Sequence, residues 1–287
     1  MKTTPAIRAG WIAAIAVAPL ILALGAGCGG SAEATLTREL RVCADPNNLP
    51  FSNRKLEGFE NRIAELVARD MNARVSYTWW PQRRGFIRHT LNASACDVVI
   101  GVPASFDIAA VTDPYYRSSY VFVTRSDRNL AIESLDDTSL QTLRIGVQLV
   151  GDDGANTPPV HALTRRGISG NLKGYLVYGD YRSARPGARI VEAVASGEID
   201  VAIVWGPIAG YFAQSQPVAL DIVPVSPQID PPFMPLVFDM AMGVRRQDTT
   251  LRMALDSILS RRRSAITSIL DEYRVPRVGT VTAVPAT

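Results

Sequence analysis

Residues 40–81 read LRVCADPNNLPFSNRKLEGFENRIAELVARDMNARVSYTWWP, and this stretch decides the fold. Residues 40–44 are an apolar, strand-like run. Residues 58–72 repeat apolar side chains at helical spacing, and residues 73–80 return to the β-branched and aromatic side chains typical of a strand. A strand, a helix and a second strand in this order predict a βαβ unit with parallel strands.

The same alternation continues along the chain. Further strands are expected at residues 96–103, 118–125, 143–150, 175–181, 201–206 and 238–246, and further helices at 188–200 and 249–273. A short helix is also expected to begin at Pro81, because proline suits the first turn of a helix. Two such series and a late return strand predict an α/β protein with two lobes. Each lobe is expected to hold a mostly parallel sheet flanked by helices, with a central cleft between the lobes.

If the closing helix expected at residues 249–273 packs on the first lobe, that lobe is discontinuous in sequence. We expect lobe 1 to comprise residues 35–124 plus 240–287 and lobe 2 to comprise residues 125–239. The hinge strands are expected near 118–125 and 237–244.

The first 34 residues have the order of a secretory signal peptide: a positive start, an apolar stretch and then small residues. Residues 32–34 form an A-x-A cleavage site. A lipid anchor at Cys28 is the less favoured route, because Gly25 stands where a lipobox normally has Leu. Either route predicts an exported, periplasmic protein with no integral membrane span after processing.

Charge and cysteine content narrow the class of protein. A net charge of +3 gives no reason to expect a nucleic-acid partner. After cleavage near residue 34, Cys43 and Cys96 remain, and two cysteines in an oxidising compartment usually pair. A disulfide is possible if their two strand-like runs are neighbours, and two buried free thiols are the rival interpretation.

Metal, cofactor and catalytic signals are weak. The cysteines and the two histidines sit at no metal-ligand spacing, and Asp152 and Asp153 are too few for a hard cation. No serine-hydrolase, phosphate-loop or zinc-protease motif appears. We therefore expect neither an enzyme nor a bound metal or cofactor.

Six motifs in order carry a resemblance to a known family. They are RVCADPNNLPFSN, WWPQRRGFIRHTL, CDVVIGVP, PYYRSSYVFV, VYGDYR and VAIVWGPIAGYFA. Together they resemble type II periplasmic solute-binding proteins and, more narrowly, the J-type accessory proteins of methanol dehydrogenase operons. The resemblance spans about residues 40–275 and implies the two-lobed periplasmic binding fold.

The sequence departs from the amino-acid-binding members of this family at both charge anchors. Those members place an Arg after the strand that here reads CDVVIG, whereas this chain has no Arg between Gly101 and Arg117. They also keep an Asp after the last strand of the second lobe, where this chain reads Trp205-Gly206-Pro207. An amino-acid ligand would leave its charges unpaired, unless Arg117 or Asp107 substitutes from another direction.

The resemblance implies a non-catalytic periplasmic accessory protein. It would bind, mature or activate a PQQ-dependent methanol or alcohol dehydrogenase, of the calcium or lanthanide type, through its interlobe cleft. The alternative is the substrate-binding component of an ABC importer for a neutral or aromatic small molecule.

Twelve residues are candidates for the cleft or for partner binding, on the ground that they follow strand ends or present aromatic and cationic groups. They are Asn47, Asn48, Phe51, Trp79, Trp80, Arg83, Arg84, Asp107, Tyr115, Tyr116, Arg117 and Trp205. For each there is a structural alternative: a turn, the core, a solvated helix face or hinge packing. Trp79 and Trp80 must face opposite sides of their strand, so at most one is expected to be fully buried.

Overall fold

The computed structural model describes residues 38–150, 155–177, 181 and 183–279. The signal peptide, Cys28, Asp152 and Asp153 lie outside the described residues. The described residues from Arg38 onward form one compact unit. None of the described helices has the length and apolarity that crossing a membrane requires.

Short helices alternate with strands along the chain. The helices are α1 (Phe59–Asp70), α2 (Phe86–His89), α3 (Pro158–Arg165), α4 (Ala188–Ala195), α5 (Gly206–Ala213), α6 (Thr249–Arg261) and α7 (Arg263–Glu272), with 3-10 turns at Ser126–Arg128 and Thr138–Gln141. The strands are β1 (Arg38–Ala44), β2 (Asn47–Asn48), β3 (Ser52–Asn53), β4 (Ala73–Trp79), β5 (Val98–Pro103), β6 (Ala110–Val111), β7 (Tyr116–Arg125), β8 (Ile145–Val150), β9 (Ala155–Asn156), β10 (Leu172–Leu176), β11 (Val201–Trp205), β12 (Leu220–Pro224), β13 (Ile229–Asp230), β14 (Met234–Pro235) and β15 (Val237–Val244).

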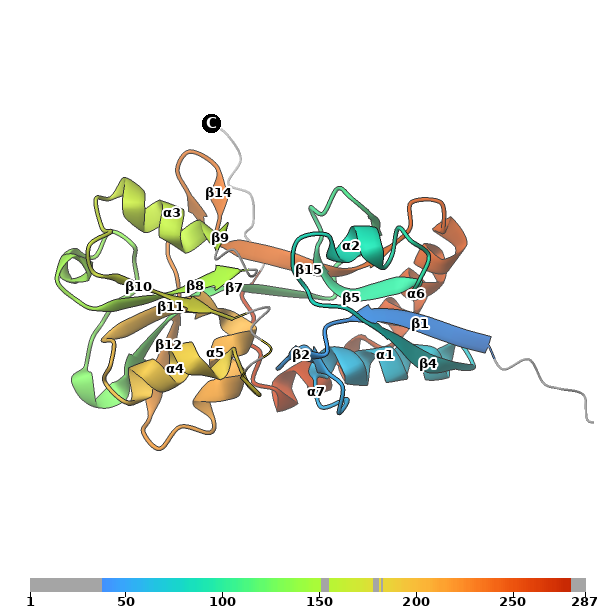
Figure 1. The fold of residues 1–287 in the computed structure, drawn as a ribbon, viewed down its shortest axis with the longest axis horizontal. Helices are drawn as coiled ribbons and strands as arrows, with labels where there is room; N and C mark the ends of the chain where they lie inside the picture. The colour runs from blue at the N-terminus through green and yellow to red at the C-terminus, as the bar shows by residue number, and fades with distance from the viewer. Residues whose placement is uncertain (1–37, 151–154, 178–180, 182, 280–287) are drawn as a thin grey trace, which may run out of the picture. The chain divides into compact units, whose positions relative to one another are not determined.

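Two parallel groups of strands meet along a pair of long antiparallel strands. In one group β4, β1 and β5 are parallel neighbours, and in the other β10, β8 and β11 are parallel neighbours. The first residues of β7 pair with β15, and its later residues pair with β11 and β12. In turn, β15 pairs with β5. Figure 1 shows β7 and β15 running between the two groups.

This arrangement confirms the expected fold class: two lobes, each an α/β sheet flanked by helices. The strands β7 and β15 lie where the hinge strands are expected. The lobe boundaries at residues 124/125 and 239/240 remain predictions.

Helix α1 covers one face of the first lobe's sheet, and α2 lies on the other face (Figure 1). The predicted stripe of α1 is buried, and Phe59, Ile63 and Val67 have no exposed surface. The residue before the helix must be glycine, because a Cβ atom at Gly58 would overlap the Phe51 carbonyl group. The chain can therefore enter α1 directly beneath the loop that follows β1.

Two helix expectations need correction. A helix beginning near Pro81 is wrong, because α2 begins at Phe86, after Gly85 in the left-handed region with φ +89°. The single helix expected over residues 249–273 is divided at Arg262, which lies between α6 and α7.

A disulfide joins Cys43 to Cys96, with 5.4 Å between their Cα atoms. Cys43 lies in β1 and Cys96 lies just before β5, and these two strands are parallel neighbours. The two cysteines therefore lie on neighbouring strands, which is the arrangement that a disulfide between them requires. The bridge lies in a small apolar cluster on the α2 side, with Phe86 and Leu91.

Removing this disulfide with the double substitution Cys43→Ala and Cys96→Ala is expected to lower the free energy of unfolding by about 4 kcal/mol. The bridge spans 53 residues, and crosslinking a loop of that size restricts the unfolded chain. Urea denaturation under non-reducing conditions measures the change. Dithiothreitol should destabilise the wild type but leave the double variant unchanged, and equal stability of the two proteins without reductant would contradict the prediction.

Candidate functional site

A pocket of about 220 Å³ lies where the two groups of strands meet. Both sheets contribute to it, and none of the described residues that line it carries a charge. The lining residues are Gln82, Gly101, Pro103, Tyr120, Gln148, Val150, Trp205, Phe238 and Met240. We call this space the interlobe pocket.

The aromatic wall of the interlobe pocket is built around Trp205, at the end of β11. The centroid of its ring lies 5.5 Å from that of Tyr120 and 5.7 Å from that of Phe238, both in edge-to-face geometry. The buried Gln148 side chain accepts a hydrogen bond from the Trp205 backbone N–H at 3.0 Å. Gln148 therefore fixes the backbone of β11 where the indole enters the pocket.

Asp45 follows β1 and organises the mouth of the pocket. Its buried carboxylate accepts hydrogen bonds from the backbone N–H of Asn47 (2.7 Å), the backbone N–H of Gln82 (2.6 Å) and the Tyr181 hydroxyl (2.6 Å). Burial raises the pKa of Asp45, and these hydrogen bonds act in the opposite direction. Because Tyr181 belongs to the second series of elements, this carboxylate joins residues from both lobes.

Glu60, in the first turn of α1, brings a second carboxyl group to the same edge. Its carboxylate lies directly over Gly101 of β5, where a Cβ atom would overlap it. The side chain is half-buried, and no described residue forms a hydrogen bond or an ion pair with it. Burial, and secondarily the neighbouring charge of Asp45, raises the pKa of Glu60 to about 8. A glutamic acid at the edge of the pocket is therefore mostly protonated at neutral pH.

Of the twelve candidate residues, Trp205 lines the interlobe pocket. The two neighbouring tryptophans face opposite ways, as strand alternation requires. Trp79 stacks on Tyr77 with centroids 4.7 Å apart, and Trp80 stacks on His89 at 5.1 Å. Neither is fully buried, and neither lines the interlobe pocket.

Three candidates follow β1, and the structure gives them separate roles. Asn47 donates to the Ser183 carbonyl oxygen at 2.7 Å and lines a broader groove of about 730 Å³ with Tyr181. Asn48 is buried and donates to the Gln82 side chain at 2.9 Å. Phe51 belongs to the core, with its ring centroid 5.3 Å from that of Phe59.

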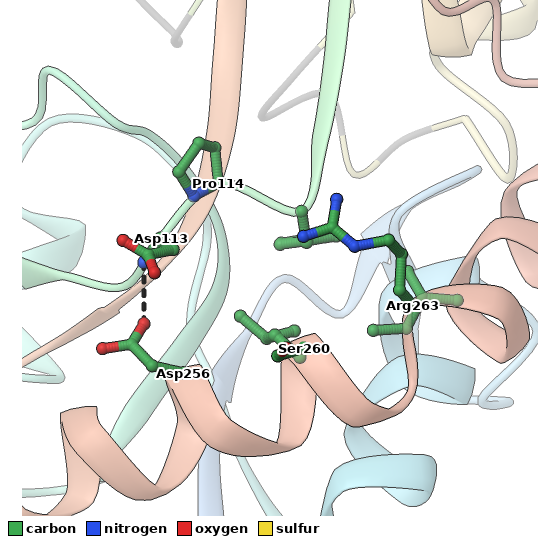
Figure 2. A pocket seen from close by; sticks show the side chains of 8 residues that line it. Asp113, Pro114, Asp256, Ser260 and Arg263 are labelled. Carbon is green, nitrogen blue, oxygen red and sulfur yellow. Dashed lines mark hydrogen bonds between the residues drawn. The ribbon is translucent and has the colours of Figure 1, made fainter.

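Tyr115 and Tyr116 lie on the first lobe's side of the site. The Tyr115 hydroxyl donates to the Ile100 carbonyl oxygen at 3.0 Å, and Tyr116 packs in the core against Phe59. Tyr115 also borders a cavity of about 90 Å³ beside α6. Figure 2 shows this cavity, where the Asp113 backbone N–H donates to Asp256 at 2.7 Å.

The charged candidates lie outside the interlobe pocket. Arg117 in β7 forms an ion pair with Asp239 of β15 at 2.8 Å, so it reinforces the pairing of these strands. Asp107 is exposed, and its carbonyl oxygen accepts from Arg246. Arg83 and Arg84 are exposed in the turn after β4, and the charge of Arg83 acts on Asp45. The geometry therefore gives no support to Arg117 or Asp107 as a replacement anchor for an amino-acid ligand.

The sequence analysis missed most of the residues that line the pocket. Glu60, which lies beside the pocket and outside its described lining, looks like an acidic residue in the first turn of a helix, which is common there. Gln148 and Phe238 lie in strands without a motif around them. The one signal that could have identified Glu60 is its position two residues after Gly58, at the C-terminal edge of parallel strands where ligands bind.

The substitution Glu60→Gln is expected to stabilise the protein at alkaline pH. The folded-state pKa of about 8 lies above the ordinary value of 4.5 for a glutamic acid, so Glu60 contributes full stability below about pH 4.5 and loses it as the pH rises through 8. At pH 9 the variant should be more stable than the wild type by about 1–3 kcal/mol, a figure that allows for the solvent contact of a half-buried group.

Urea denaturation at pH 5 and at pH 9 measures this effect. The advantage of the variant should shrink towards pH 5, whereas Glu65→Gln on the same helix should show no such dependence. A pH-independent difference between the wild type and Glu60→Gln would contradict an elevated pKa.

Comparison with known proteins identifies the family of this chain. Residues 40–274 match the model of bacterial extracellular solute-binding proteins, family 3. Protein MoxJ of Methylorubrum extorquens is 34% identical over 249 residues, which cover 83% of this chain and 81% of that protein. Protein MoxJ of Paracoccus denitrificans is 28% identical over 260 residues, covering 84% and 89%.

A solved structure agrees with these sequence matches. The periplasmic binding protein XoxJ from Methylobacterium extorquens AM1 superposes with a TM-score of 0.69 at 36% identity, covering 84% of this chain and 100% of that one. The chain therefore belongs to family 3 of the bacterial extracellular solute-binding proteins and, within the type II periplasmic binding fold, to the MoxJ subfamily.

Proposed function

We propose that this protein is a non-catalytic accessory protein of the periplasm, which binds a PQQ-dependent methanol or alcohol dehydrogenase through the interlobe pocket. Membership of the MoxJ subfamily supports this role, because the sequence resembles the accessory proteins of methanol dehydrogenase operons. The periplasmic setting is supported by the expected signal peptide and by the description of XoxJ as a periplasmic binding protein.

The chemistry of the interlobe pocket carries the proposal. Three aromatic rings wall it, and none of its described lining residues is an arginine or a lysine that could receive a ligand carboxylate. Aromatic side chains supply much of the binding energy at protein interfaces. A zwitterionic amino acid would lose its hydration in this pocket without gaining a cationic partner for its carboxylate.

The size of the pocket favours a protein partner over an imported metabolite. Pockets for drug-sized ligands measure about 300–1,000 Å³, whereas the interlobe pocket measures about 220 Å³. A space of this size accepts one or two side chains of a docked protein. Maturation or activation of the dehydrogenase would follow from this binding.

The substitution Phe238→Ala tests the role of the pocket. Phe238 is half-buried in the aromatic wall, so its removal should weaken the capture of a quinoprotein dehydrogenase from periplasmic extract by roughly 30-fold, as for an interface hot spot of about 2 kcal/mol. The measurement is the affinity of the purified dehydrogenase for immobilised wild-type and variant protein, after circular dichroism has shown that both are folded.

Phe233→Ala is the matched control, because Phe233 is 88% exposed and lies outside the pocket lining. It should leave the affinity unchanged. Failure of the wild type to capture any quinoprotein dehydrogenase would contradict the proposed function. A neutral or aromatic small molecule that raises the melting temperature of the wild type would instead favour an importer component.

A further inference from the structure

The broader groove of about 730 Å³ differs from the interlobe pocket in its charge. Its described lining carries three cationic side chains, Arg54, Lys55 and Arg185, and one acidic side chain, Glu57. The interlobe pocket, by contrast, has no charged side chain among its described lining residues. We call the larger space the basic groove.

The basic groove and the interlobe pocket are joined through Asp45. Its carboxylate accepts hydrogen bonds from the Asn47 backbone N–H and the Tyr181 hydroxyl, and both of these residues line the groove. The same carboxylate accepts from the backbone N–H of Gln82, which lines the pocket. Because one carboxylate supports both linings, the two spaces are neighbours, and a protein docked at the interlobe pocket lies beside the basic groove.

A rigid turn after β3 forms the cationic wall of the basic groove. The buried Asn53 side chain donates to the Glu57 carboxylate at 2.7 Å and accepts from the Glu57 backbone N–H at 2.9 Å. The Leu56 backbone N–H closes the turn by donating to the Asn53 carbonyl oxygen at 3.0 Å. Arg54 and Lys55 are therefore presented by a backbone fixed on both sides, which lowers the entropy cost of binding a partner.

The two cations of this turn are not neutralised by any residue that the structure describes. Arg54 and Lys55 are both exposed, and neither forms an ion pair with a described residue. The Arg54 guanidinium lies over the Trp79 ring, 5.8 Å from its centroid. Stacking on an aromatic face orients a guanidinium while its edge stays available for a carboxylate, which it binds through two parallel hydrogen bonds.

The second lobe adds another cation, and apolar side chains accompany the charges. Arg185 lies 3.5 Å from the carboxylate of Glu192, and both side chains are about half exposed. Such a pair contributes little stability, so the guanidinium can exchange Glu192 for another carboxylate. Leu49 and Tyr181 add apolar area to the lining, and Leu56 is 40% exposed at the end of the turn.

We propose that the basic groove binds an acidic loop of the partner dehydrogenase, whose Asp or Glu carboxylates pair with Arg54 and Lys55. The inference rests on the proposed function for the identity of the partner, but not for the chemistry of the groove. Pockets that hold ligands larger than one side chain measure about 300–1,000 Å³, and the volume of about 730 Å³ falls in that range. A concave lining with apolar side chains among the cations favours a peptide segment over the flat surface of an anionic membrane.

Isothermal titration of the mature wild-type protein with the peptide acetyl-DEDLDE-amide tests the chemistry of the groove, with acetyl-NQNLNQ-amide as its uncharged counterpart. Saturable binding of the acidic peptide is expected at low salt. Raising sodium chloride from about 20 mM to about 300 mM should weaken this binding roughly tenfold, because salt screens exposed charges. Equal binding of the two peptides, or no saturable binding of the acidic one, would overturn the inference without reference to any dehydrogenase.

Two double variants assign the binding to the turn. Arg54→Gln with Lys55→Gln should weaken binding of the acidic peptide roughly tenfold at low salt and reduce its salt dependence. Arg69→Gln with Arg74→Gln is the matched control and should bind as the wild type does. Both of these arginines are exposed on the first lobe, outside the groove lining and in no ion pair with a described residue. Unchanged binding by the first variant, or an equal loss in the control, would overturn the assignment.

The identity of the partner is tested separately with the purified dehydrogenase. The double variant at Arg54 and Lys55 should bind it roughly tenfold more weakly than the wild type at low salt, and the acidic peptide should compete with it. Capture that is strong and insensitive to both would overturn the inference while leaving the proposed function standing. Absence of capture by the wild type would contradict the proposed function, and peptide binding that the double variant loses would then assign the groove to an acidic segment of another protein.

Vesicles of phosphatidylglycerol provide the test against a membrane surface. The inference predicts that the wild type and the double variant at Arg54 and Lys55 sediment with these vesicles to the same small extent. Vesicle binding that the double variant loses, together with no binding of the acidic peptide, would overturn the inference in favour of an anionic lipid surface.

Discussion

The antiparallel pairing of β7 with β15 is the constraint on which the interlobe pocket depends. Val237 to Met240 pair with Ser119 to Tyr116, and an ion pair between Arg117 and Asp239 reinforces this short ladder. Beyond the ladder, β7 continues into the sheet that holds Trp205, and β15 continues into the sheet that holds Gly101. The carboxyl ends of parallel strands from both groups therefore lie around one shared space, and the lining residues of the pocket come from both sides of this junction.

The pocket combines features that normally belong to different kinds of site. Its rings and small volume are typical of the place where an anchor side chain of a partner protein is buried. The carboxyl groups of Asp45 and Glu60 lie beside it, outside its described lining, at the edge of the sheet where open α/β folds bind ligands. None of the described lining residues is an arginine or a lysine that could receive a ligand carboxylate, so the lining is suited to uncharged and apolar groups. One fold can carry unrelated functions, and the function proposed for this solute-binding fold is recognition of another protein.

The sequence predicted the features that periodicity and spacing determine. The βαβ alternation, the two crossing strands, the opposite orientation of Trp79 and Trp80 and the bridge between Cys43 and Cys96 follow from local patterns or from the neighbourhood of two parallel strands. The expected helix after Pro81 was wrong, because the left-handed Gly85 delays it until Phe86. The composition of the pocket depends on contacts between residues far apart in the chain, such as Gln148 with Trp205 and Glu60 with Gly101. No local pattern reports such contacts, and the sequence therefore identified Trp205 but neither Glu60 nor Gln148.

Site-specific photo-crosslinking tests the central claim, that the interlobe pocket is the surface that binds a dehydrogenase. A benzophenone amino acid at Gln82, on the pocket lining, is compared with the same group at Met253, which is 56% exposed on α6. The account predicts a covalent adduct with a quinoprotein dehydrogenase from position 82 and none from position 253. Adducts with the dehydrogenase from position 253 but not from position 82 would contradict it.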